Sequence, residues 1–141
     1  MVERLTVFSG GHGATEILYS LAGQPPRQVT VLVNGFDDGK STGLVRKLIP
    51  DMWGPSDFRK VNTTALTAHG HVWASIFENR ELFGSFSPEI AVAQLMTSLQ
   101  GFRAEPEIQK MVQAVELFWE LAEAKDSHHE LGDLALGNAI L

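Results

Sequence analysis

The sequence contains no cysteine, no long apolar run and no excess of basic residues. The lack of cysteine excludes disulfides, thiolate zinc sites and cysteine nucleophiles, and it fits a cytoplasmic location. No apolar run reaches the roughly 20 residues that a membrane span requires. Lys and Arg number 11 against 17 Asp and Glu, so the net charge of −6 argues against a nucleic-acid-binding surface. A nucleotide-sized anion can still be held locally by a few backbone N–H groups.

The composition is that of one soluble globular domain. The chain has 141 residues, of which 44% are apolar and 20% charged. In the first half, strands over 5–8 and 28–33 enclose a helix over 14–22, which predicts a parallel βαβ unit. Because the apolar run 5–8 does not alternate, we expect this strand to be covered on both faces. The fold class expected is therefore α/β.

The second half is expected to be mainly helical. Ser87-Pro88 starts one helix that Gly101 closes, and a second helix spans 106–125. The second helix has a core-facing stripe of Ile108, Met111, Val112, Val115, Phe118, Trp119 and Ala122.

Two strands are too few for a stable parallel sheet. Further strands would be hidden in residues 60–85, supplied by partner chains in a homo-oligomer, or contributed by a longer protein. We prefer the last interpretation, in which residues 1–141 are one incomplete N-terminal α/β nucleotide-binding domain, because LGDLALGNAIL at the end resembles the start of another helix.

A glycine-rich turn follows the first strand, in Ser9-Gly10-Gly11-His12-Gly13. Glycines let a ligand approach the backbone, and the N–H groups of the next helix would face an anion. The alternative is a turn needed only for tight packing. His12 is a candidate phosphate contact or general acid.

A second turn, in Val31–Gly43, ends in Gly39-Lys40-Ser41 and looks like a Walker A phosphate loop. The Walker A spacing fails because only three residues separate Gly35 from Gly39, where the pattern needs four. Asp37 and Asp38 instead favour Mg²⁺ bound by carboxylates and ligand phosphate oxygens, or hydrogen bonds from ligand hydroxyls to the carboxylates. Lys40, Ser41 and Thr42 would face those phosphates.

Four blocks of sequence together resemble a known family. GGHGA, VNGFDDGKSTGLVRK, GPSDFRKVNTTAL and LALGN resemble, in order and spacing, blocks of the 2-phospho-L-lactate transferase family and its YvcK-like branch. The resemblance implies a Rossmann-like fold in proteins longer than 141 residues. The second block is closer to the YvcK-like form.

The resemblance also implies site residues. Asp37 and Asp38 are the implied catalytic and metal-ligating residues. The implied ligand-binding residues are Gly10, Gly11, Gly13, Gly39, Ser41, Thr42, Gly43, Arg46, Asp57, Arg59 and Asn138. His12 and Lys40, named above from their own chemistry, complete the set of candidate ligand-binding residues. The chain departs from the family pattern at His12, Ala14, Lys40, Ser56 and Asn62, which puts the identity of the ligand in doubt.

Several of these residues also have purely structural interpretations. Asp57 would complement the dipole of a helix starting after Gly54-Pro55, with Arg59 exposed. His69 and His71 face apart at a spacing of two, which disfavours a metal pair. His128 and His129 are expected to be solvated.

Three functions follow from the resemblance. The first is binding of a nucleotide diphosphate or nucleotide sugar of the UDP-N-acetylglucosamine kind, with an influence on carbon or cell-wall metabolism. The second is Mg²⁺-dependent transfer of a phospholactyl-type group from a guanosine diphosphate-linked donor to a deazaflavin acceptor. The third is a degenerate, non-catalytic interaction module.

Overall fold

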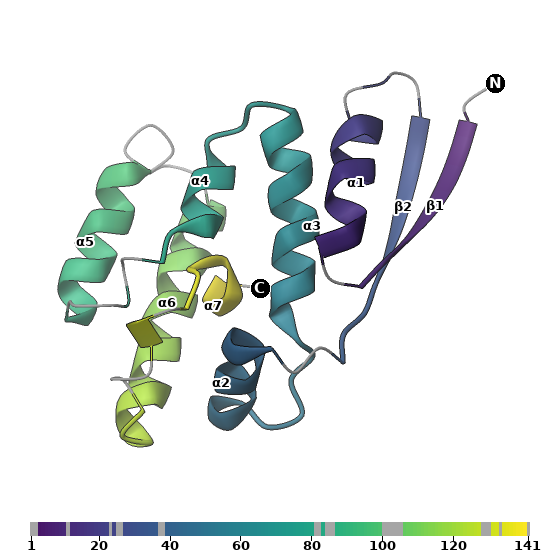
Figure 1. Cartoon of the computed structure of the whole chain (residues 1–141). Coiled ribbons are helices and arrows are strands. Elements are labelled where there is room, and N and C mark those ends of the chain that lie inside the picture. The colour runs from purple at the N-terminus through teal and green to yellow at the C-terminus, as the bar shows by residue number, and fades with distance from the viewer. Residues whose placement is uncertain are drawn as a thin grey trace.

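The chain is a mixed α/β protein, mostly helical, in a computed structural model (Figure 1). The structure describes residues 3–10, 12–22, 24, 27–36, 39–80, 83, 87–99, 106–127, 131–132 and 134–140. The elements in chain order are β1 (Glu3–Ser9), η1 (His12–Ala14), α1 (Thr15–Ala22), β2 (Arg27–Val33), α2 (Lys40–Leu48), α3 (Pro55–Ala68), α4 (Trp73–Glu78), α5 (Pro88–Ser98), α6 (Pro106–Ala124) and α7 (Gly137–Ile140).

The two strands form a parallel pair, as the βαβ pattern predicts. Their register runs from Glu3 opposite Arg27 to Ser9 opposite Val33. Because the strands are parallel, both carboxyl ends lie at one edge, where β1 enters η1 and β2 leads toward α2. The helices α1 and α3 stand beside this sheet on one side (Figure 1).

The prediction that the first strand is covered on both faces is wrong. Phe8 is paired with Leu32 in the register, and these side chains are 78% and 48% exposed. Successive side chains of a strand alternate between faces, so only one face of the pair receives the packed helices. The apolar run carries no signal for this because the residues of a strand do not show on which face the helices will pack.

The core lies among the helices of the second half, with α2. Its largest fully buried side chains include Val45, Leu95, Leu99, Ile108 and Val115. The helix α6 buries the predicted stripe, with Met111 and Val112 half-buried at its margin. Phe83 stacks on Trp119 at a ring distance of 5.8 Å. The prediction of a helical second half with this core face is therefore confirmed.

Two predictions about the middle of the chain need correction. The described residues of 60–85 contain no strand, because α3 continues to Ala68 and α4 follows. The helix that starts after Ser87 ends at Ser98, earlier than the predicted stop at Gly101. Leu99 is its C-cap and is fully buried, and its N–H donates to the Leu95 carbonyl. Gly101 lies outside the described residues.

Candidate functional site

The turn after β2 is held in place by Arg46, one of the residues named from sequence. The Arg46 guanidinium donates to the Gly35 carbonyl at 2.9 Å and to the Met52 carbonyl at 3.2 Å. Gly54 N–H also donates to the Gly35 carbonyl, at 2.8 Å. A Cβ on Gly35 would lie 2.6 Å from the Trp53 ring, so a larger residue there would force the exposed Trp53 side chain to move. Arg46 thus positions the strand-end turn against the segment that precedes α3.

Residues from three of the resembling blocks meet in one buried hydrogen-bond network. Thr42 Oγ1 donates to Ser56 Oγ at 2.9 Å, and Asn138 Nδ2 donates to the same oxygen at 3.3 Å. Asn138 in turn accepts from Arg59 Nε at 3.0 Å. All four residues are buried. The network joins the starts of α2 and α3 to α7, more than 70 residues away in sequence.

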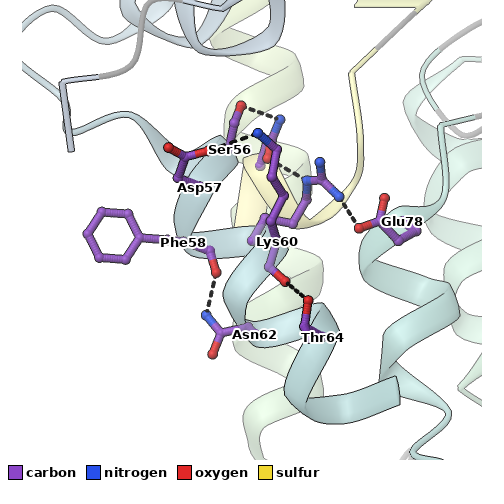
Figure 2. A network of polar contacts seen from close by, with 9 residues as sticks. Ser56, Asp57, Phe58, Lys60, Asn62, Thr64 and Glu78 are labelled. Atoms are coloured by element: carbon purple, nitrogen blue, oxygen red, sulfur yellow. Dashed lines mark hydrogen bonds and ion pairs between the residues drawn. The ribbon is translucent and has the colours of Figure 1, made fainter. Parts of the chain in front are cut away.

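Arg59 links this network to α4. Its guanidinium forms an ion pair with Glu78, at the last turn of α4 (Figure 2). The Arg59 side chain is 4% exposed and that of Glu78 is 43% exposed. Gly137 allows this arrangement, because a Cβ there would lie 2.9 Å from Arg59 Cγ and 3.0 Å from the Phe77 carbonyl oxygen. The purely structural interpretation, in which Arg59 is exposed, is therefore wrong.

Asp57 lies in the first turn of α3, as predicted. It accepts from Lys60 Nζ at 2.8 Å, with the Asp57 side chain 4% exposed (Figure 2). A carboxylate in this position is favoured by the positive end of the helix dipole. Phe58 points away from this cluster in Figure 2, so the charged groups occupy one side of α3.

A cleft of about 520 Å³ opens beside this cluster. Its walls come from the start of α1, the start of α2, one side of α3 and the end of α4. The lining residues are Thr15, Tyr19, Gly39, Lys40, Ser41, Ser56, Arg59, Lys60, Thr63, Thr64, Thr67, Glu78 and Arg80.

The cleft is positively charged in an acidic chain. Among its described lining residues, four cations (Lys40, Arg59, Lys60 and Arg80) stand against one carboxylate, Glu78, which gives 4 − 1 = +3, whereas the whole chain has a net charge of −6. Charges lining a concave surface focus the field within it. The electrostatics therefore favour an anionic small molecule.

The start of α2 adds backbone groups to the same cleft. Gly39, its N-cap, and the next residues Lys40 and Ser41 line the wall. The first turn of α2 contains no acidic residue. Because helix N-termini present N–H groups and a partial positive charge, this wall can receive phosphate oxygens.

The structure brings together only part of the predicted site. Gly39, Lys40, Ser41 and Arg59 line the cleft. Four other predicted residues are not among its described lining residues. These are Thr42 and Asn138 in the buried network, Asp57 beside Lys60, and Arg46 at the turn. Gly43 is half-buried within α2.

The first glycine loop contributes less than predicted among the described residues. Gly10 follows β1 and Gly13 lies in η1, and neither is among the described residues that line the cleft. His12 begins η1, and its side chain lies outside what the structure describes. Thr15, which starts α1, lines it instead. Gly11, Asp37 and Asp38 lie outside the described residues, as do His128 and His129. His71 accepts a hydrogen bond from Trp73 N–H at 3.3 Å, next to the start of α4.

Sequence reasoning missed much of the α3 wall. Ser56, Lys60, Thr63, Thr64 and Thr67 all line the cleft. Their spacings of three and four place them on one face of a helix, and four of the five carry hydroxyls. A polar stripe at helical spacing after the GPSDFRK block was the available signal. Glu78 and Arg80 come from a later segment that carries no such pattern.

The described residues do not form a ligand set for Mg²⁺. They contain no group of three or more His, Asp or Glu side chains close enough to hold a metal ion. The predicted metal site on Asp37 and Asp38 falls outside this part of the chain. The described walls of the cleft present lysine and arginine side chains, which suit an anionic ligand. A magnesium site at Asp37 and Asp38 remains a prediction.

Comparison of the chain with protein-family models, with curated proteins and with solved structures found no match. Among the described residues, no helix is both long enough and apolar enough to cross a membrane. The fold and the cleft thus define a mixed α/β chain with a cationic, hydroxyl-lined cleft beside the carboxyl end of a parallel strand pair.

Proposed function

We propose that the chain binds a nucleotide diphosphate or a nucleotide sugar in this cleft. The observation that carries the proposal is the charge of the lining, four cations to one carboxylate in a chain of net charge −6. Phosphate oxygens would lie at the start of α2, between the Lys40 ammonium and the cations of α3. We further propose that the strand pair is the beginning of a Rossmann-like sheet, since the cleft adjoins the edge where such sheets bind nucleotides.

The buried network supports this proposal by fixing the walls. Arg59 is held through Nε by Asn138 and through its guanidinium end by Glu78. A cation that is already oriented loses little side-chain entropy when a phosphate arrives. Thr42 and Ser56 hold α2 against α3, which keeps the first turn of α2 aimed at the same volume. The network therefore serves a positioning role.

The family resemblance ranks the three candidate functions. The second block favours binding of a UDP-N-acetylglucosamine-type ligand by a protein that regulates carbon or cell-wall metabolism. The second candidate is the Mg²⁺-dependent phospholactyl-type transferase, and its metal and catalytic groups would be Asp37 and Asp38. A degenerate interaction module is the third candidate, supported by the departures at Lys40 and Ser56 from the family pattern.

Thermal-shift measurements with UDP-N-acetylglucosamine, GDP and GTP, each with and without Mg²⁺, separate the three. A ligand at 100 times its dissociation constant stabilises the folded state by about 2.7 kcal/mol, which raises the melting temperature by several degrees. Stabilisation by the UDP-sugar alone supports the first candidate. Guanine-nucleotide stabilisation that depends on Mg²⁺ supports the second. No stabilisation by any of them leaves the interaction module.

A matched pair of variants tests whether the ligand binds in the cleft. Lys40→Ala removes one lining cation, whereas Lys110→Ala removes an exposed cation of α6 outside the cleft. We expect the stabilisation by ligand to fall in the first variant and to persist in the second. Equal loss in both variants would indicate a non-specific charge effect and would contradict the proposed site.

A further inference from the structure

One buried polar atom on the cleft wall lacks a partner. Among the described residues, Thr63 Oγ1 is a buried side-chain oxygen with no hydrogen bond, in a residue that is only 9% exposed. Its neighbour Thr64 differs, because the Thr64 hydroxyl donates to the Lys60 carbonyl at 2.8 Å. A buried hydroxyl without a partner costs about 1–3 kcal/mol. In the free protein, the Thr63 hydroxyl is therefore an unsatisfied hydrogen-bonding group at the edge of the proposed ligand site.

Thr63 lies on the same side of α3 as the buried cation Arg59. Thr63 follows Arg59 by four residues on α3, so both lie on the same face of the helix, about 6 Å apart along its axis. Thr67 continues this face one turn further and also lines the cleft. The wall thus changes along α3 from a guanidinium to hydroxyls, from a surface suited to phosphate to one suited to neutral polar groups.

We propose that Thr63 is a specificity-determining residue, whose hydroxyl hydrogen-bonds a neutral polar group of the ligand, such as a sugar hydroxyl, about one helical turn from the phosphate. This inference rests on the proposed function, since it requires a phosphate at the cationic end. Thr63 Oγ1 is covered in the free protein, so the contact requires rotation about χ1. Threonine in a helix populates two χ1 wells, and rotation exchanges the hydroxyl with the methyl group.

Three variants test the inference: Thr63→Val, Thr63→Ser and the control Thr97→Val, at an exposed threonine of α5 outside the cleft whose hydroxyl donates to the Ala93 carbonyl at 2.8 Å. Calorimetric titration measures the dissociation constants of inorganic pyrophosphate and of UDP-N-acetylglucosamine or GDP, whichever the unmodified chain binds. We expect Thr63→Val to weaken the nucleotide ligand about tenfold, the size of one net hydrogen bond, and to change pyrophosphate binding less than twofold. Thr63→Ser keeps the hydroxyl and should retain the original affinity, as should Thr97→Val.

The melting temperature of the ligand-free protein supplies a second readout. Because Thr63→Val replaces an unpartnered hydroxyl by a methyl group of the same size, we expect no decrease. A fall of several degrees would show that the hydroxyl is structurally satisfied and would overturn the inference. Equal loss of both ligands, or of neither, would also overturn it while leaving the proposed function intact. If the unmodified chain binds neither pyrophosphate nor nucleotide, the proposed function itself fails.

Discussion

Arg59 and Asn138 are joined by a hydrogen bond of 3.0 Å between the guanidinium Nε and the amide Oδ1, across 79 positions of sequence. Arg59 comes from the first half of α3 and Asn138 from α7, and they are 3% and 1% exposed. This bond fixes the one buried cation of the described cleft lining. Through this bond, α7 at the end of the described chain helps to hold Arg59 in the cleft wall.

Asn138→Ala tests that support. The variant leaves Arg59 Nε and Ser56 Oγ without a partner that they have now. Loss of a partner to a buried group costs about 1–3 kcal/mol, so we expect the free energy of unfolding to fall by that amount in chemical denaturation. Asn62→Ala is the control, because the Asn62 side chain is exposed and its change should stay within about 0.5 kcal/mol. An equal loss of stability in Asn138→Ala and Asn62→Ala would mean that the buried network does not stabilise the fold more than an exposed side chain does.

Gly137→Ala tests the close approach of α7 to Arg59. The new methyl carbon would lie 2.9 Å from Arg59 Cγ and 3.0 Å from the Phe77 carbonyl oxygen. Such overpacking costs about 1–3 kcal/mol, which thermal or chemical unfolding measures. Gly13→Ala is the matched control, because no atom lies within 4 Å of its added Cβ. An unchanged stability of Gly137→Ala would show that α7 is not packed on Arg59.

Glu78→Gln tests the charge of the cleft. Glu78 contributes the lone carboxylate of the described lining and neutralises Arg59. Removing its charge should strengthen pyrophosphate binding a few-fold at low salt, and the gain should shrink as salt screens the cleft. Glu107→Gln, an exposed change at the start of α6, should leave the affinity unchanged. Weaker binding by Glu78→Gln would mean that the carboxylate itself contacts the ligand.

Asp37→Asn tests the predicted magnesium site. If Asp37 and Asp38 bind Mg²⁺ together with ligand phosphates, the variant should lose the Mg²⁺-dependent part of ligand affinity and keep its melting temperature. Titrations with and without Mg²⁺ measure this part directly. An unchanged Mg²⁺ dependence would remove the aspartate pair from the site.

Local patterns were sufficient for much of the fold. The apolar spacing of 106–125 predicts the buried face of α6, and the strand–glycine–helix–strand order predicts the parallel pair. Asp57 was placed correctly in a first helical turn because Gly54-Pro55 marks a helix start. These features depend on residues that are neighbours in sequence.

The features missed depend on distant segments. Arg59 was named as a site residue, but its burial and its contacts were missed because its partners Glu78 and Asn138 lie 19 and 79 residues away. The exposure of Phe8 was missed because a strand's own residues do not show which face receives a helix. The α3 wall of the cleft was missed because threonines at helical spacing are ordinary on a solvated face. It is the neighbouring helices α1, α2 and α4 that make this face a cleft lining.

The most direct test of the proposed cleft follows the backbone amide resonances during a titration with UDP-N-acetylglucosamine or GDP. We expect saturable shifts at Lys40 and Ser41, at the start of α2, and at Lys60 and Thr63 on the α3 wall, with the exposed face of α6 around Lys110 unchanged. Shifts confined to residues outside the cleft, or no saturable shifts with either nucleotide, would contradict the proposal that this cleft holds a phosphorylated ligand.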